Sequence, residues 1–124
     1  MKKIAIFGST GSIGTSLLNI VKKDKKNFKI KLISANKSYK KLIKQATFFN
    51  VKNLIITDQN SFLKAKKILK NRNINVYNNF DSFKKIFNNK KIDYTMSAIS
   101  GFEGLKPTLD VIKFTKVIAI ANKE

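Results

Sequence analysis

Three glycines spaced three residues apart follow the first apolar segment of the chain. They lie in residues 8–14, GSTGSIG, between the strand-like segment Lys3–Phe7 and a helical pattern. Glycine lets a backbone bend sharply and approach a ligand closely, and the amides that open a helix attract anions. The spacing is G-x-x-G-x-x-G, not the G-x-G-x-x-G of the NAD fingerprint, but a strand–turn–helix junction is the expected setting for a pyrophosphate. We therefore predict a dinucleotide site here, with a purely structural turn as the alternative.

Polar residues follow the second strand-like segment, where the ribose of a dinucleotide is recognised. Phe28–Ala35 is followed by Asn36, Lys37 and Ser38. An NAD-dependent protein places Asp or Glu here to bind the ribose 2′-hydroxyl. A cation between two small polar groups suits a 2′-phosphate instead, so these residues favour NADP. The alternative is that Lys37 is simply one of the 25 lysines of the chain.

Residue types that commonly perform catalysis or hold metals are scarce. The chain has no His and no Cys. The acidic residues stand singly, without paired spacing: Asp24, Asp58, Asp81, Asp93, Glu103, Asp110 and Glu124. We therefore predict no catalytic residue and no metal ligand in this segment.

Apolar segments alternate with amphipathic ones along the whole chain. The expected strands are Lys3–Phe7, Phe28–Ala35, Asn53–Thr57, Asn75–Tyr77, Ile92–Ala98 and Lys116–Ala121. Apolar residues at helical spacing lie between them, in 13–21, 39–46, 61–69, 82–87 and 105–114. Such alternation predicts one α/β domain, residues 1–124, with a Rossmann-type doubly wound, mostly parallel sheet and helices on both faces. Phe48, Phe49, Met96 and the other aromatic residues are expected in the core.

The net charge of +19 could indicate a nucleic-acid-binding surface. However, Arg72 is the only Arg, and base recognition favours Arg. Lys, Asn and Ile make up 56 of the 124 residues, as A/T-rich codons would produce. We interpret the charge mainly as genome composition on solvated faces and expect no nucleic-acid partner.

No apolar run is long enough to span a bilayer. The first strand begins at Lys3, which leaves no room for a signal or transit peptide. A cytoplasmic location without membrane contact is expected.

Two further segments carry a family resemblance. Residues 97–109 read SAISGFEGLKPTL, and residues 119–124 read AIANKE. Together with the glycine turn, they resemble the NADPH-binding domain of the 1-deoxy-D-xylulose 5-phosphate reductoisomerases over the whole chain. In that family the matching residues that contact NADPH are Thr10, Gly11, Ser12, Ile13, Asn36, Lys37, Ser38, Asn122 and Glu124, and Lys123 contacts the substrate. This chain departs from the family at Asn36, where Gly is frequent, and at Ser38, where Asn is common.

The resemblance implies an NADPH-dependent enzyme of non-mevalonate isoprenoid biosynthesis. It would convert 1-deoxy-D-xylulose 5-phosphate, a phosphosugar, to 2-C-methyl-D-erythritol 4-phosphate with a divalent Mg or Mn ion. In the family the metal ligands come after the A-N-K-E motif. The 124 residues are therefore expected to be a fragment, without the catalytic and C-terminal domains and inactive alone. For the full-length enzyme the resemblance implies a homodimer.

Other functions share parts of this pattern. Semialdehyde dehydrogenases also have a G-x-x-G-x-x-G turn, and their catalytic Cys would fall beyond residue 124. Short-chain dehydrogenases fit less well, because no Tyr of this chain is followed four residues later by Lys. A non-catalytic nucleotide- or nucleic-acid-binding Rossmann domain is the alternative from another class.

Overall fold

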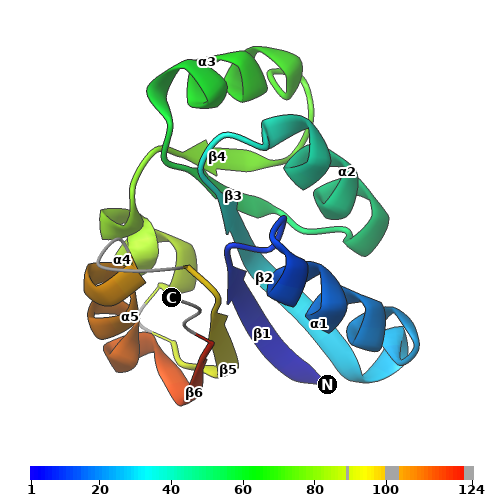
Figure 1. The fold of residues 1–124 in the computed structure, drawn as a ribbon, viewed down its shortest axis with the longest axis vertical. Coiled ribbons are helices and arrows are strands. Elements are labelled where there is room, and N and C mark those ends of the chain that lie inside the picture. Colours follow the sequence, from blue (N-terminus) through cyan, green and yellow to red (C-terminus); the bar gives the residue numbers. More distant parts are fainter. Residues whose placement is uncertain (89, 100–103, 122–124) are drawn as a thin grey trace.

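Six strands form one sheet in which all neighbouring strands run parallel, in the order β4-β3-β2-β1-β5-β6 (Figure 1). The computed structural model describes residues 1–88, 90–99 and 104–121. The strands are β1 Lys2–Phe7, β2 Phe28–Ala35, β3 Asn53–Ile56, β4 Asn75–Tyr77, β5 Ile92–Ser97 and β6 Thr115–Ile120. The predicted Rossmann-type sheet is confirmed, and within these strands it is wholly parallel.

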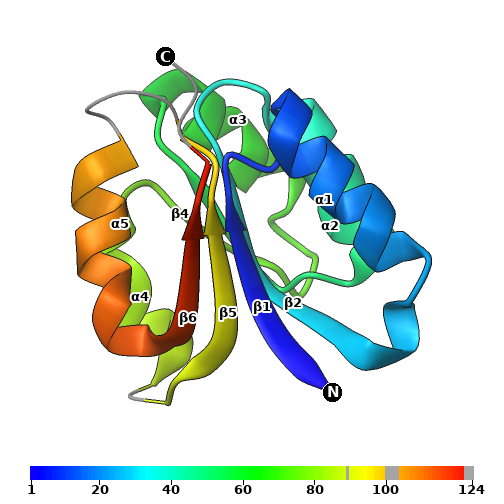
Figure 2. The same ribbon diagram turned by 60° about the horizontal axis from the view of Figure 1, so that its bottom comes forward.

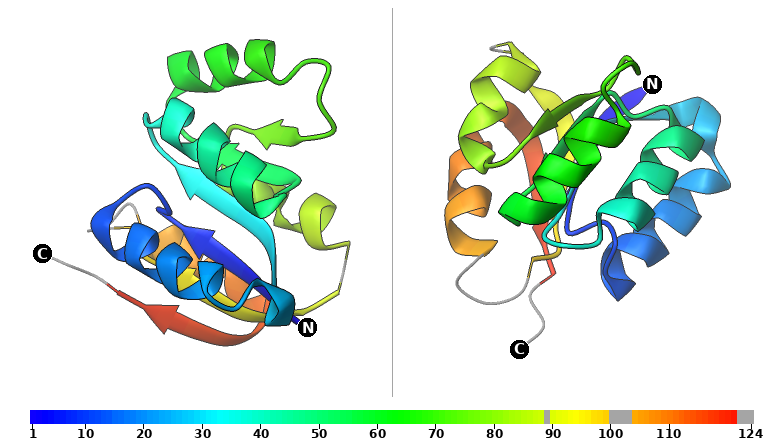
Figure 3. Two further views of the ribbon diagram at one scale, coloured as in Figure 1. Left: turned by 90° about the vertical axis from the view of Figure 1, so that its right-hand side faces the viewer. Right: turned by 90° about the horizontal axis from the view of Figure 1, so that it is seen from above.

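Helices cover both faces of the sheet, as predicted. The α-helices of the described residues are α1 Ser12–Lys22, α2 Tyr39–Phe49, α3 Gln59–Ile68, α4 Phe83–Phe87 and α5 Leu105–Val111. Short 3₁₀ turns lie at η1 Lys25–Asn27, η2 Phe80–Ser82 and η4 Ile112–Phe114. Helices α1 and α2 lie on one side of the sheet, and α4 and α5 lie on the other (Figures 2 and 3). Among the described helices, none has the length and apolar character needed to cross a membrane.

Two hydrophobic cores result from the alternation of side chains along the strands. In β1, Ile4 and Ile6 pack into the core that also holds buried residues of α1, α2 and α3. Ala5 and Phe7 point to the opposite face, where they pack with residues of α4 and α5. Side chains of a strand point alternately to its two faces, so a central strand between two helix layers must be apolar on both.

The chain reverses its direction across the sheet after β4. From β1 it proceeds to β2, β3 and β4, and then crosses back to β5 on the other side of β1. The 3₁₀ turn η2 and helix α4 belong to this crossover. A parallel sheet has its ligand crevice where such a reversal separates the loops at the carboxyl ends of the strands. The topology therefore places a site at the ends of β1 and β5.

The structure corrects several details of the sequence-based expectation. Helix α5 ends at Val111 and continues as the 3₁₀ turn η4, not as α-helix to Phe114. Phe48 was expected in the core, but 48% of its surface is exposed. The Lys25 ammonium lies 4.4 Å from the centre of the Phe48 ring, at the end of α2. The ring is therefore covered by a lysine and solvent, because the position at the end of the helix turns away from the sheet.

Candidate functional site

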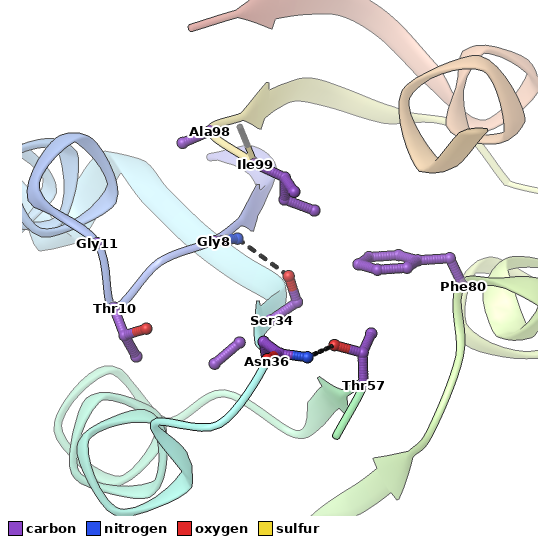
Figure 4. Close-up of a pocket in the computed structure, with 10 residues that line it drawn as sticks. Gly8, Thr10, Gly11, Ser34, Asn36, Thr57, Phe80, Ala98 and Ile99 are labelled. Carbon is purple, nitrogen blue, oxygen red and sulfur yellow. Dashed lines mark hydrogen bonds between the residues drawn. The ribbon is translucent and has the colours of Figure 1, made fainter. Parts of the chain in front are cut away.

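A cavity of about 480 Å³ opens where the structure places the glycine turn (Figure 4). Gly8, Thr10 and Gly11 of the turn line one side of it. The end of β2 and the residue after it, 34–36, form the adjoining wall. The turn and the predicted ribose-binding segment, about 25 residues apart in sequence, thus face the same space.

The remaining walls come from three other parts of the chain. Thr57 follows β3, and Phe80 begins the crossover from β4. Ala98 and Ile99 follow β5. The cavity therefore lies at the carboxyl ends of β1, β2, β3 and β5, which is the crevice that the reversal of strand order predicts.

Hydrogen bonds to β2 hold the glycine turn in place. The amide of Gly8 donates to Ser34 Oγ over 3.0 Å, and the amide of Ser9 donates to the Ser34 carbonyl, also over 3.0 Å. Gly8 has a φ of +75°, a conformation that other residues rarely adopt. The turn closes with a bond of 3.2 Å from the Gly11 amide to the Gly8 carbonyl. The start of the turn is thus fixed in shape before any ligand binds.

Gly11 and Gly14 have opposite surroundings. A Cβ added to Gly11 would meet only the Gly8 carbonyl oxygen, at 3.6 Å, and would otherwise point into open space beside the cavity. A Cβ added to Gly14 would lie 2.5 Å from both Gly8 O and Ser9 Cα. Gly14 therefore allows α1 to approach the turn, whereas Gly11 leaves room for a ligand.

Helix α1 begins directly at this open space. Gly11 is its N-cap, and glycine has no side chain that could bond to the amides of the first turn. The first amides of an α-helix have no partner within the helix, and they carry the positive end of its dipole. Because a Cβ at Gly11 would point into open space beside the cavity, where α1 begins, the residues present leave room for a pyrophosphate.

Helix α2 is bonded to the turn by two side chains that lie one helical turn apart. Lys41 Nζ donates to the Thr10 carbonyl over 2.8 Å. Gln45 receives a bond of 2.7 Å from Ser9 Oγ and donates one of 3.1 Å to the Ser9 carbonyl. Ser9 is fully buried, so these bonds satisfy polar groups that would otherwise be costly to bury. No local sequence pattern indicates this connection.

The three residues after β2 are all exposed at the edge of the cavity region. Asn36 lines the cavity and donates from Nδ2 to Thr57 Oγ1 over 2.7 Å (Figure 4). Ser38 is the N-cap of α2, without a side-chain cap bond. The carbonyl of Lys37 accepts bonds from the Tyr39 amide and from Ser61 Oγ. These bonds hold the backbone of Lys37 and do not involve its ammonium group.

An acidic side chain lies near Lys37, although none follows β2. Asp58 comes after β3 and caps α3 by accepting bonds from the Ser61 amide, over 3.1 Å, and from Ser61 Oγ, over 2.7 Å. These bonds lower the pKa of Asp58, and the charges of Lys37 and Lys64 lower it further. Asp58 is thus held ionised as a helix cap, rather than at the position where an NAD-dependent protein binds the ribose.

The structure brings some of the predicted cofactor residues to the cavity wall and leaves others beside it. Thr10, Gly11 and Asn36 line the cavity. The others in the described part of the chain adjoin these in sequence but are not wall residues: Ser12, Ile13, Lys37 and Ser38. The remaining predicted residues lie outside the described residues: Asn122, Lys123 and Glu124.

Outside the glycine turn, six wall residues were not predicted as site residues: Ser34, Ala35, Thr57, Phe80, Ala98 and Ile99. Ser34 and Thr57 are polar residues at or after strand ends, which is a weak but usable signal. Ile99 follows β5 in the segment that carries the family resemblance. Phe80 gave no signal, because its place in the wall depends on the path of the crossover from β4.

Residues 1–88, 90–99 and 104–121 bring together no group of three or more His, Cys, Asp or Glu side chains that could hold a metal ion. Two acidic residues in this part of the chain have structural roles far from each other in the sequence. Asp93 accepts a bond of 2.8 Å from the Lys3 amide, which lowers its pKa, and Asp110 pairs with Lys106 at 2.7 Å.

Known proteins resemble the chain over its full length. A model of the 1-deoxy-D-xylulose 5-phosphate reductoisomerase family matches residues 4–124. The reductoisomerase of Pelagibacter ubique (strain HTCC1062) is 73% identical over 125 residues, which cover 100% of this chain and 32% of that protein. The reductoisomerase of Clostridium tetani (strain Massachusetts / E88) is 40% identical over 126 residues, covering 100% of this chain and 33% of that protein.

Solved structures show the same fold. The reductoisomerase of Zymomonas mobilis in complex with NADPH superposes with a TM-score of 0.86 and 30% identity, over 98% of this chain and 32% of that one. The chain thus spans about a third of the length of the relatives it matches. Because the family model covers nearly every residue, the chain belongs to the 1-deoxy-D-xylulose 5-phosphate reductoisomerase family.

Proposed function

We propose that this chain is the NADPH-binding domain of a reductoisomerase that converts 1-deoxy-D-xylulose 5-phosphate to 2-C-methyl-D-erythritol 4-phosphate. The observation that carries the proposal is the open space in front of Gly11, at the start of α1 and beside the cavity. The related protein of Zymomonas mobilis is described in complex with NADPH. Family membership and a site of the required shape thus support the same cofactor.

The residues of the chain would bind and orient the cofactor. The amides of Ser12 and Ile13 would hold the pyrophosphate, and Asn36 and Lys37 would hold the adenosine ribose and its 2′-phosphate. NADPH, when bound, would supply a hydride for the reduction. From the family resemblance, Ser38, Asn122 and Glu124 would also contact NADPH, and Lys123 would contact the phosphosugar.

The wider properties of the enzyme are also proposals. The reaction would use a divalent ion, Mg²⁺ or Mn²⁺, held by residues that in the family follow the A-N-K-E motif. The full-length enzyme would be a homodimer in the cytoplasm. The enzyme would act in the non-mevalonate pathway of isoprenoid biosynthesis.

We expect the chain to bind NADPH more tightly than NADH. Lys37 lies next to the predicted ribose site, and the acid nearby, Asp58, is engaged with Ser61. One exposed charged contact to the 2′-phosphate contributes about 1–2 kcal/mol, or roughly 5- to 30-fold in Kd. Calorimetric titration of the chain with NADPH and with NADH measures the two Kd values and hence the preference.

The matched control for this titration is Lys44→Ala, which removes an exposed lysine of the same helix region that does not line the cavity. Lys37→Ala should bring the two affinities together, and Lys44→Ala should leave the preference intact. Equal affinities for NADPH and NADH in the unaltered chain would contradict the assignment of NADP, and so would an unchanged preference in Lys37→Ala.

We also expect no reductoisomerase turnover from the 124-residue chain alone. The rearrangement requires groups that hold and polarise two substrate oxygens, and the described residues gather no set of ligands for a metal ion. NADPH oxidation is measured with 1-deoxy-D-xylulose 5-phosphate and Mg²⁺ or Mn²⁺, using protein from a host without its own enzyme. The full-length relative of Pelagibacter ubique serves as the positive control. Sustained, metal-dependent oxidation by the chain itself would show that residues assigned to binding perform the chemistry.

A further inference from the structure

Phe80 occupies an unusual place between the second core and the cavity. It begins η2, at the start of the crossover from β4 to β5. On one side its ring contacts Phe7 of β1 edge-on, with the ring centres 5.2 Å apart. The centre of the Phe83 ring lies 5.8 Å from that of Phe80. Phe7 and Phe83 are themselves buried and stacked at 5.4 Å. Buried aromatic neighbours therefore fix the orientation of the Phe80 ring.

The other side of Phe80 is open to the cavity. The residue is only half-buried, and its ring points into the space that the turn and the strand ends enclose (Figure 4). Ile99 also extends into this space, while Asn36 and Thr57 present polar groups on the β2–β3 side (Figure 4). The cavity thus combines a flat aromatic face, an aliphatic side chain and a polar edge.

This combination matches the chemistry of a purine base. A purine has flat apolar faces and a polar rim, and stacking of a base on an aromatic side chain is favourable. The position agrees with the expected path of a dinucleotide. With the pyrophosphate at Gly11 and the ribose at Asn36, the base continues from the end of β2 toward Thr57 and Phe80.

We propose that Phe80 forms the stacking face of the adenine subsite, with Ile99 beside the ring. The proposal rests on the proposed function, since it assigns the base of the same cofactor. The alternative role for Phe80 is packing against the second core without any contact to a ligand. The two roles differ in a measurable way, because only a stacking face responds to a ligand that carries adenine and lacks nicotinamide.

The chain contains no tryptophan, so a single introduced Trp reports on its own surroundings. The probe is adenosine 2′,5′-bisphosphate, which has the adenine and the 2′-phosphate of NADPH and does not absorb at the emission wavelength of Trp. We expect saturable quenching of the fluorescence of Phe80→Trp by this probe. The matched control is Phe48→Trp, at an exposed aromatic position outside the cavity wall, where no quenching is expected.

Removal of the ring provides the second arm. Phe80→Ala should weaken binding of NADPH and of adenosine 2′,5′-bisphosphate by about tenfold, whereas Phe48→Ala should not. The preference for NADPH over NADH should stay the same in Phe80→Ala, because both nucleotides carry adenine. Phe80→Leu keeps an apolar side chain against Phe7 and Phe83, and it serves if the alanine variant fails to fold by circular dichroism.

The outcomes separate this inference from the proposed function. If the unaltered chain binds NADPH and folded Phe80→Ala or Phe80→Leu binds it equally well, the adenine subsite is wrong and the proposed function stands. The same conclusion follows if Phe80→Trp binds adenosine 2′,5′-bisphosphate calorimetrically without a change in fluorescence. If the unaltered chain binds neither nucleotide, the proposed function and the inference both fail.

Discussion

Replacement of Gly11 by valine is expected to abolish NADPH binding and to leave the domain folded. Gly11 has a φ of −75° and a ψ of 176°, which valine adopts readily, and an added Cβ would meet only the Gly8 oxygen at 3.6 Å. The branched side chain would instead occupy the space in front of the first amides of α1. Loss of the pyrophosphate contacts should raise the Kd more than about 100-fold, which corresponds to about 2.7 kcal/mol.

The measurement for Gly11→Val is NADPH titration beside urea unfolding of the same protein. Because valine is a poorer N-cap than glycine, we expect a loss of about 1 kcal/mol in the free energy of unfolding. Gly11→Ala is the graded control and should weaken binding less, since its methyl group fills less of the space. A folded Gly11→Val that binds NADPH like the unaltered chain would show that the phosphates lie elsewhere.

Gly14→Ala is expected to lower the stability of the fold, whereas Gly11→Val lowers the affinity for the ligand. The added Cβ would lie 2.5 Å from Gly8 O and from Ser9 Cα, both of which are backbone atoms that hydrogen bonds to Ser34 hold in place. Helix α1 must therefore shift away from the turn. We expect a loss of about 3 kcal/mol in the free energy of unfolding, or about 10 °C in Tm, after allowing for the higher helix propensity of alanine.

Urea and thermal unfolding of Gly14→Ala, followed by circular dichroism, check this expectation. Gly11→Ala is the matched control, because it adds the same methyl group three residues earlier in the same turn, where there is room. We expect Gly14→Ala to be far less stable than Gly11→Ala. Equal stability of the two variants would contradict the close approach of α1 to the turn.

Much of the fold could be predicted because its signals are local. The strand–glycine turn–helix unit is formed by consecutive residues. The 3.6-residue periodicity of the apolar residues predicts both α1 and α2. The order of the strands is less accessible. Alternation of strands and helices predicts a parallel sheet, but the position of β5 beside β1 depends on which surfaces pack together.

The contacts that local sequence patterns did not indicate have the same physical origin. Gln45 and Lys41 contact the turn across more than 30 residues, and no local pattern indicates such a contact. Phe80 and Phe48 were both expected in the core as aromatic residues. Composition could not tell that one would line the cavity and the other would lie under Lys25 at the surface, because the crossover path and the end of α2 decide this.

We propose that NADPH binds at the glycine turn, at the carboxyl ends of β1 and β2. The most direct test is the set of backbone amide chemical shifts of the ¹⁵N-labelled chain during titration with NADPH. We expect saturable shifts concentrated in residues 8–13 and 34–38, with smaller changes at Thr57, Phe80 and Ile99. Saturable binding with shifts confined to other surfaces, or a folded chain whose spectrum NADPH does not change, would contradict it.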